Sequence, residues 1–251
     1  SLMTNGNCNN LALRFTLSRN STDNQIFPRR GSEIQLSVAF TPPYSLWDGK
    51  DYANLANNPS SSTYMRELQD KYSWIEYHKW KFKARTFTAL SGHNKCFVLM
   101  TRAEIGLLGS YNKHKPSPFE NYYMGGDGTS GYSSLYSTET IGLRGYDNGS
   151  ITPPGNMGYA YTRFSVELRS PFMLGASTNV FGLIFAEGGN CWSSIGEFNP
   201  FDMKKSVGVG ARIFLPMVGL LGIDWAYGFD KVQGVSTYGG SHFHFVLGQE
   251  F

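Results

Sequence analysis

The chain has 251 residues, of which 41% are hydrophobic, 15% aromatic and only 16% charged. Its 18 Phe, 15 Tyr and 5 Trp exclude a disordered chain. No apolar run approaches the roughly 18 residues that a transmembrane helix requires, which excludes a helical membrane protein. The net charge of +3, without a dense basic cluster, gives no reason to expect a nucleic-acid partner. An all-β protein remains, either soluble or in an outer membrane.

Apolar residues alternate with polar ones along most of the chain, which is typical of strands with one apolar face. Several of these segments are longer than the usual five or six residues of soluble strands and approach the roughly 9 to 11 of a tilted membrane-spanning strand. An apolar run at 180–185 adds one strand, so we expect about nine. The alternating segments are 11–17, 34–40, 80–90, 97–107, 164–168, 207–215, 221–229 and 243–251.

The connections between these segments alternate in length. Short links at 91–95 and 216–219 take turns with long ones, and short turns on one side with long loops on the other are typical of an outer-membrane barrel. The pattern therefore favours a transmembrane antiparallel β-barrel over a soluble β-sandwich. The long connections are 41–73, 110–158, 188–204 and 230–241.

An odd number of strands cannot close an antiparallel barrel without pairing two edge strands in parallel. The polar first ten residues also contain no signal peptide, so the start of an exported protein would have been processed or cut away. We therefore expect residues 1–251 to be the C-terminal part of a larger barrel domain.

One charged pair bears on the strand register. A tight turn at 216–219 predicts that Arg212 lies opposite Asp224 on the polar face. A cross-strand ion pair of this kind stabilises a sheet by roughly 0.2 to 1 kcal/mol. Because this is a single pair, a chance placement of the two opposite charges is the alternative.

The sequence contains little that indicates bond chemistry, so we expect no catalytic residues, no metal and no cofactor. His242 and His244 share a strand face but lack a nearby third zinc ligand, which favours polar residues facing the barrel lumen. The Gly-Gly-Asp-Gly stretch at 125–128 precedes neither a Lys-Ser/Thr pair nor a helix, unlike a phosphate loop. The three cysteines are far apart and indicate neither a disulfide framework nor a zinc site.

Residues 26–31, 118–126, 143–146 and 185–189 form four segments whose motifs and order resemble the BamA family of the bacterial surface antigen superfamily. The family's signature at the tip of its long sixth loop is a branched apolar residue followed by Arg-Gly-Phe or Arg-Gly-Tyr, and it is matched by Leu143, Arg144, Gly145 and Tyr146. The family's Phe-x-Asp-x-Gly motif is matched by Phe185, Glu187 and Gly189, with Glu in place of the usual Asp. The other two segments are Ile26–Gly31, which resembles a turn before a strand, and Pro118–Gly126, which resembles the opening of the sixth loop.

The resemblance covers nearly the whole chain and implies about the eighth to the sixteenth strand of a sixteen-stranded barrel. It implies that loop 110–158 folds into the lumen and that Arg144 meets the acidic residue of the Phe-x-Asp-x-Gly motif, here Glu187. A guanidinium can make two hydrogen bonds to one carboxylate, which suits such a contact. From the residues alone, a solvated loop arginine is the alternative.

The C-terminal segment is the second functional element that the resemblance implies. It contains Phe245, Leu247 and Gly248 and ends on the aromatic Phe251, as the assembly signals of bacterial outer-membrane proteins do. An aromatic ring suits the membrane interface. In the family, the seam between the first and last strands opens, and an incoming strand pairs with the exposed edge. Gly248 would either weaken that seam or leave room for the loop.

The implied function is the folding and insertion of other β-barrel proteins into the bacterial outer membrane. The implied partners are outer-membrane lipids, unfolded β-barrel clients and, through a missing periplasmic part, accessory lipoproteins. A protein-translocating pore of the TamA or two-partner secretion type is the first alternative. A passive porin-like channel and a soluble β-rich binding module follow.

Overall fold

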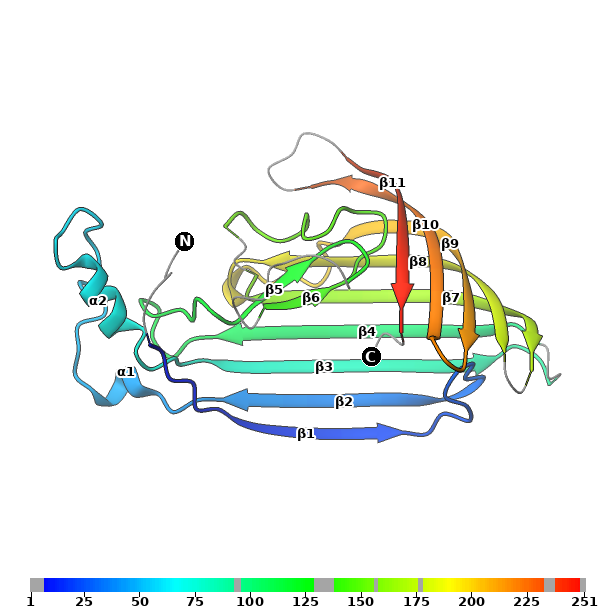
Figure 1. Ribbon diagram of the computed structural model, residues 1–251, viewed down its shortest axis with the longest axis horizontal. Coiled ribbons are helices and arrows are strands. Elements are labelled where there is room, and N and C mark those ends of the chain that lie inside the picture. The colour runs from blue at the N-terminus through cyan, green and yellow to red at the C-terminus, as the bar shows by residue number, and fades with distance from the viewer. Residues whose placement is uncertain are drawn as a thin grey trace.

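The computed structural model describes residues 7–92, 96–128, 138–155, 158–175, 178–232 and 238–248. Within these ranges, nine strands form one antiparallel sheet in the order β1-β2-β3-β4-β7-β8-β9-β10-β11, which curls round on itself (Figure 1). The strands are β1 (Leu13–Asn20), β2 (Arg30–Phe40), β3 (His78–Ala89), β4 (Val98–Gly109), β7 (Ala160–Leu174), β8 (Asn179–Trp192), β9 (Lys204–Leu215), β10 (Gly219–Lys231) and β11 (Tyr238–Leu247). About nine strands were predicted, and the prediction of an all-β antiparallel fold is confirmed.

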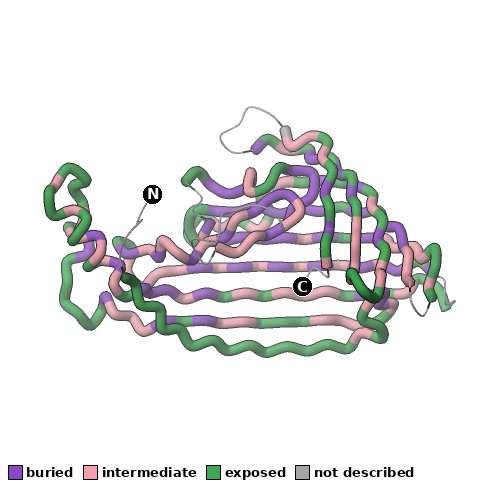
Figure 2. The backbone as a smooth tube through the Cα atoms, viewed as in Figure 1, coloured by how far each residue is buried: buried purple, intermediate pink, exposed green. Residues whose placement is uncertain are grey.

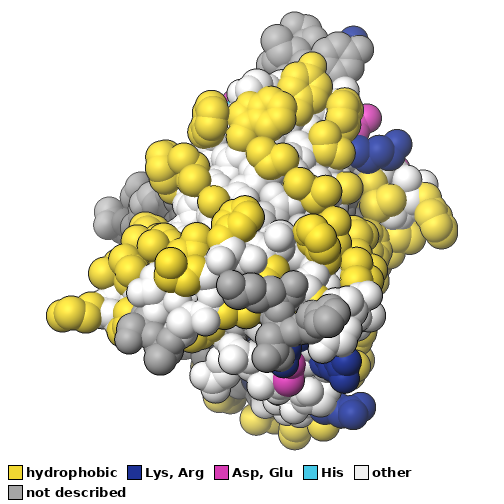
Figure 3. Space-filling view, turned by 90° about the vertical axis from the view of Figure 1, so that its right-hand side faces the viewer, with side chains coloured by type: hydrophobic (Ala, Val, Ile, Leu, Met, Phe, Trp, Pro, Cys, Tyr) yellow, Lys and Arg dark blue, Asp and Glu magenta, His cyan; other side chains and the backbone are white. Residues whose placement is uncertain are grey.

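The two faces of the sheet have the opposite polarity to that of a soluble protein. Buried and exposed residues alternate along the strands (Figure 2). Large apolar side chains point outward, for example Ile184, which is 55% exposed, and Val209, which is 49% exposed. Charged side chains such as Arg102 and Glu167 are buried on the inner face. Hydrophobic side chains accordingly cover much of the outer surface (Figure 3). This arrangement is expected of a barrel wall whose outer face contacts lipid. The nine-stranded sheet is called the wall below.

Connections of different length occur around the sheet, but the predicted long connection at 230–241 is wrong, because β10 continues to Lys231 and β11 begins at Tyr238. The links after β3, β7 and β9 are short, whereas those after β2 and β4 are long. The predicted loop at 188–204 is partly wrong, because β8 continues to Trp192 and pairs with β7 up to that residue. Three helices were not predicted: α1 (Tyr44–Trp47) and α2 (Tyr64–Lys71) after β2, and the short 3-10 helix η1 (Ile195–Glu197) after β8. No helix in the described ranges is long and apolar enough to cross a membrane.

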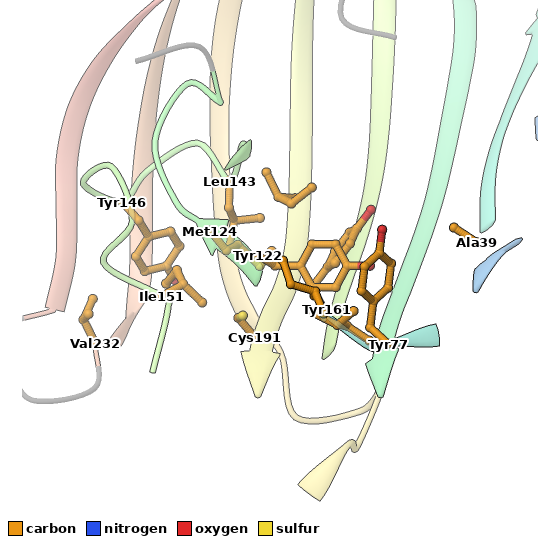
Figure 4. Close-up of a cluster of buried hydrophobic side chains, with 13 residues drawn as sticks. Ala39, Tyr77, Tyr122, Met124, Leu143, Tyr146, Ile151, Tyr161, Cys191 and Val232 are labelled. Carbon is orange, nitrogen blue, oxygen red and sulfur yellow. The ribbon is translucent and has the colours of Figure 1, made fainter. Parts of the chain in front are cut away.

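The long connection after β4 lies within the curve of the sheet (Figure 1). It contains two short parallel strands, β5 (Asn121–Met124) and β6 (Thr138–Ile141). Side chains of this connection pack against the inner face of the wall in one buried cluster (Figure 4). Loop residues Tyr122 and Leu143 are fully buried there, as is Tyr161 of β7. The loop therefore supplies much of the apolar core that the inner face would otherwise lack.

The two edges of the nine-stranded sheet are β1 and β11. Among the described residues, neither strand pairs with anything on its outer side. The inference that residues 1–251 form the C-terminal part of a barrel domain stays a prediction, and so does the number of strands in the whole barrel.

A charged substitution on the outer face tests whether that face contacts lipid or water. We expect Ile184→Lys to destabilise the protein in a bilayer by about 2–4 kcal/mol, because a lysine near the middle of the hydrocarbon loses its hydration. The control is Phe201→Lys, since Phe201 is 86% exposed in the loop after β8. Urea unfolding in lipid vesicles measures both. Equal stability of the two variants would exclude lipid contact at Ile184.

Candidate functional site

The candidate site is the loop tip, residues 143–146 of the long connection after β4. Arg144 is buried there against the inner face of the wall. Its guanidinium contacts three carboxylates: Nη2 lies 2.6 Å from Oε1 of Glu187 and 2.7 Å from Oε1 of Glu167, and Nη1 lies 3.0 Å from Oδ2 of Asp224. These acids come from β8, β7 and β10 respectively. Phe185 lies beneath the guanidinium, with its ring centroid 3.5 Å from Cζ. One loop side chain thus joins three strands of the wall.

Glu187 binds the loop through two different groups. Besides the guanidinium, it accepts a hydrogen bond from the backbone N–H of Arg144 at 3.0 Å. The structure therefore brings together Arg144 and Glu187 as the resemblance implied. The longer Glu side chain reaches both the backbone and the side chain of the same residue. Hydrogen bonds to a charged group are roughly twice as strong as neutral ones, so Glu187 is a firm attachment point for the loop.

Each of the three acids also has an arginine partner on the wall itself. Among the described residues, these ion pairs join four arginines, Arg144 included, to the three acids, so each carboxylate keeps an arginine partner if the loop withdraws. The wall pairs are Arg163 with Glu187 at 3.2 Å, Arg169 with Glu167 at 2.8 Å and Arg212 with Asp224 at 2.5 Å. Buried charges are tolerated only when they are paired and hydrogen-bonded, and this network meets that condition.

The ion pair between Arg212 and Asp224 is present, but the predicted register is wrong. Arg212 lies opposite Gly222, and Asp224 lies opposite Gly210, so the pair is diagonal. Both glycines leave the space that this diagonal needs. A Cβ on Gly222 would lie 2.6 Å from Cδ of Arg212, and one on Gly210 would lie 1.8 Å from Oδ1 of Asp224. The pair therefore depends on glycine at the two facing positions.

Tyr146 anchors the other side of the loop tip. Its hydroxyl donates a hydrogen bond to the carbonyl oxygen of Lys205 at 2.6 Å and accepts one from the N–H of Asp230 at 3.4 Å. Burial raises the pKa of this hydroxyl to about 12, so it stays protonated and can donate. Leu143 on the opposite side of Arg144 is buried in the apolar cluster (Figure 4). The four signature residues thus bind the wall by one charged, one polar and one apolar contact around a glycine.

Gly189 occupies a place where the loop approaches the wall closely. A Cβ there would lie 2.6 Å from Cε of Met124, which belongs to β5 in the loop. The Phe-x-Glu-x-Gly segment therefore contacts the loop at all three of its predicted residues: Phe185 by its ring, Glu187 by its carboxylate and Gly189 by its lack of a side chain.

The terminal strand β11 places Phe243, Phe245 and Leu247 on the outer face. Phe245 is 64% exposed and Leu247 is 68% exposed. Gly248 follows the strand with a φ of +81° and donates its N–H to the carbonyl oxygen of Leu220 at 2.7 Å. It is thus a strand-end turn residue, and nothing within 4 Å would meet a Cβ there, so the idea that it leaves room for the loop is wrong. Phe251 lies outside the described residues.

Several residues of the site were not assigned to it from the sequence. Glu167 was not singled out from the sequence, and Asp224 was predicted only as the partner of Arg212. His244 was predicted only to face the lumen, although it accepts a hydrogen bond from the loop tip. The sequence signal that could have identified them is the set of charges of both signs on one face of 163–169. Such charges need partners when that face is buried.

Gly145 allows a direct test of the close contact at the loop tip. Its φ is +90°, and a Cβ would lie 2.8 Å from Cβ of Ser206 and 2.9 Å from the backbone N of Gly228. Gly219 has the same φ of +90° with nothing within 4 Å. We expect both Gly→Ala variants to lose about 1–2 kcal/mol from the left-handed backbone.

Only Gly145→Ala should also displace the loop tip, and limited proteolysis of the loop measures that displacement. Equal protease sensitivity of Gly145→Ala and Gly219→Ala would show that the tip does not depend on this contact.

Comparisons with known proteins identify the family of this chain. The chain matches the Omp85 superfamily domain over residues 2–251. The outer membrane protein assembly factor BamA of Neisseria meningitidis serogroup B (strain ATCC BAA-335 / MC58) is 31% identical over 173 residues, which are 67% of this chain and 19% of that protein. The crystal structure of BamA from Haemophilus ducreyi lacking POTRA domains 1-3 has the same fold, with a TM-score of 0.63 at 19% identity, covering 93% of this chain and 41% of that one.

The chain therefore spans less than two thirds of the length of either relative. The match over residues 2–251 nevertheless extends across the loop, the acid-bearing strands and the terminal strand. The chain belongs to the Omp85 superfamily and is part of a β-barrel of the bacterial outer membrane.

Proposed function

We propose that this chain is the barrel part of a factor that folds and inserts other β-barrel proteins into the outer membrane. The observation that carries the proposal is the buried loop tip, in which Arg144 contacts carboxylates on three strands. The 31% identity to a protein named as an outer membrane protein assembly factor supports it.

The loop tip would keep one part of the wall rigid while another part exchanges partners. Arg144 ties β7, β8 and β10 to a single group, so these strands cannot separate without exposing buried charge. The terminal strand β11 is outside this triple contact. A rigid wall beside a movable edge is the arrangement that an openable seam requires.

In this proposal an incoming client strand pairs with an exposed strand edge of the seam. Lipid cannot satisfy unpaired backbone N–H and C=O groups, so an open edge in the membrane favours any strand that can pair with it. The exchange needs no nucleotide and no covalent step, so we propose that the protein is not an enzyme. The proposed partners are outer-membrane lipids, unfolded clients and, through a periplasmic part of the protein, accessory lipoproteins.

A protein-translocating pore of the same superfamily is the alternative function. The passive channel receives less support, because the loop fills the inner face of the sheet with a buried apolar cluster. The fate of client proteins separates an assembly factor from a secretion pore: the first changes the amount of folded barrels in the membrane, the second the amount of one exported protein.

Charge exchange between the loop and the wall tests the proposed role. We expect Arg144→Glu to impair assembly, because it adds a fourth carboxylate to three that are already buried. Glu187→Arg should impair it as well, because it places one more guanidinium beside those of Arg144 and Arg163. The double variant should recover only part of the function, since the new carboxylate at the loop tip would regain one partner but still face Glu167 and Asp224. Growth and the levels of folded outer-membrane proteins measure the effect.

The matched control is Arg66→Glu, which makes the same charge change at an exposed residue of α2. It should behave as wild type. If Arg144→Glu and Glu187→Arg also leave folded barrel levels unchanged while secretion of an exported protein falls, the secretion pore replaces the assembly factor as the proposed function. If neither readout changes, the loop tip has no role in function.

A further inference from the structure

We propose that the loop tip also holds the terminal strand β11, that His244 is the positioning residue for this contact, and that the contact requires a neutral imidazole. Acid would then release β11 from the loop while leaving the contacts of Arg144 in place. The consequence for seam opening rests on the proposed function, whereas the contact itself does not.

The contact is a hydrogen bond between the loop backbone and the last strand. The N–H of Gly145 donates to Nε2 of His244 at 2.9 Å. His244 is buried, with 6% of its surface exposed. The preceding N–H, that of Arg144, donates to Glu187 on β8. Two consecutive amides of the loop tip are therefore held by two strands that are not neighbours in the sheet.

Glycines on β10 and β11 allow the tip to approach the strands this closely. A Cβ on Gly228 would lie 2.3 Å from the carbonyl oxygen of Gly145, and one on Gly239 would lie 2.7 Å from the same atom. The ring of Tyr146 fills the remaining space beside both glycines. The tip thus packs on β11 over the stretch from Gly239 to His244.

A second histidine touches the same loop from the same strand. Nδ1 of His242 lies 3.4 Å from Oδ1 of Asp147, and its ring stacks on that of His244 at 6.0 Å between centroids. Variants at the two positions therefore separate the contact of His244 from that of His242.

The geometry assigns the proton positions in His244. Because Nε2 accepts a hydrogen bond, the neutral ring carries its proton on Nδ1. A second proton would occupy Nε2 and place one donor against another. The charged and titratable groups that face His244 are His242 on the same strand, Asp224 on β10, and Arg144 and Asp127 in the loop.

The release of β11 would matter because the loop-tip contacts lie on its inner side, where Val246 is also buried. Its backbone pairs with β10 along one edge, and its large side chains Phe243, Phe245 and Leu247 point outward. On the inner side, the contacts with the loop tip restrain the strand. A weaker tip contact would therefore favour movement of the strand that borders the proposed seam.

The test measures hydrogen exchange of the 142–147 segment in the full-length protein, purified in detergent, at about pH 7.5 and about pH 5.5, which lie on either side of the ordinary histidine pKa of about 6.5. Exchange is corrected for its chemical pH dependence. In the wild type we expect protection to fall by about fivefold on acidification, the factor that corresponds to one ordinary hydrogen bond.

Three variants make the result specific. His244→Gln keeps an acceptor that does not titrate, so its protection should be independent of pH. His244→Leu has no acceptor and should show low protection at both values. His242→Gln, the matched control on the same strand, should keep the wild-type fall. A wild-type fall in His244→Gln, or its loss in His242→Gln, would overturn the proposal.

Levels of folded outer-membrane proteins in the same variants separate this proposal from the proposed function. If exchange follows His244 as expected but His244→Leu assembles clients at the wild-type level, the contact exists and has no part in assembly. If the pH dependence of exchange is unchanged in the His244 variants, the proposed contact between the loop tip and His244 is rejected, whatever the assembly result.

Discussion

The burial of one cation determines much of this structure. Arg144 lies where water cannot reach it, and a guanidinium in such a place must be surrounded by carboxylates. Those carboxylates come from β7, β8 and β10, so the strands must hold a fixed spacing and curvature. The loop in turn must enter the curve of the sheet deeply enough to deliver its tip. Glycines at the points of closest approach and arginines beside each acid follow from the same requirement.

The reversed polarity of the sheet makes such a network possible. In a soluble protein the inner face is apolar, and a cluster of seven charged groups would have no place in it. Here lipid provides the apolar surroundings on the outer face, so the inner face can hold charges that pair with one another. The loop then covers the remaining inner surface with Tyr122, Leu143 and Tyr146. These side chains bury the apolar part of the inner face, as a second sheet does in a β-sandwich.

The architecture followed from the sequence better than the details of the site did. Alternation, with one apolar run, located the nine main strands, because a wall with two different faces imposes a strict period of two. The pairing of Arg144 with Glu187 followed only from a family resemblance, since no spacing rule joins residues so far apart. Glu167 and Asp224 were missed as its partners because their convergence depends on the curvature of the sheet. The diagonal between Arg212 and Asp224 was missed because the register depends on the turn at its end.

The helices α1 and α2 were missed for a different reason. They are short, they lie in a long connection without strong periodicity, and their main buried contacts, such as Ser45 with Glu76, join residues that only the fold brings together. Local sequence therefore carried little information about them.

The sequence separations within the loop-tip contacts also constrain how this chain itself can fold. Arg144 meets Glu187 across 43 positions and Asp224 across 80, and Gly145 meets His244 across 99. None of these contacts can form until the later strand has been placed, and the last depends on β11. Contacts of such long range form late in folding, because the entropy lost on closing a large loop precedes the stabilisation that the contacts provide. We therefore expect the loop tip to be buried late in folding, after β7, β8, β10 and β11 have been placed.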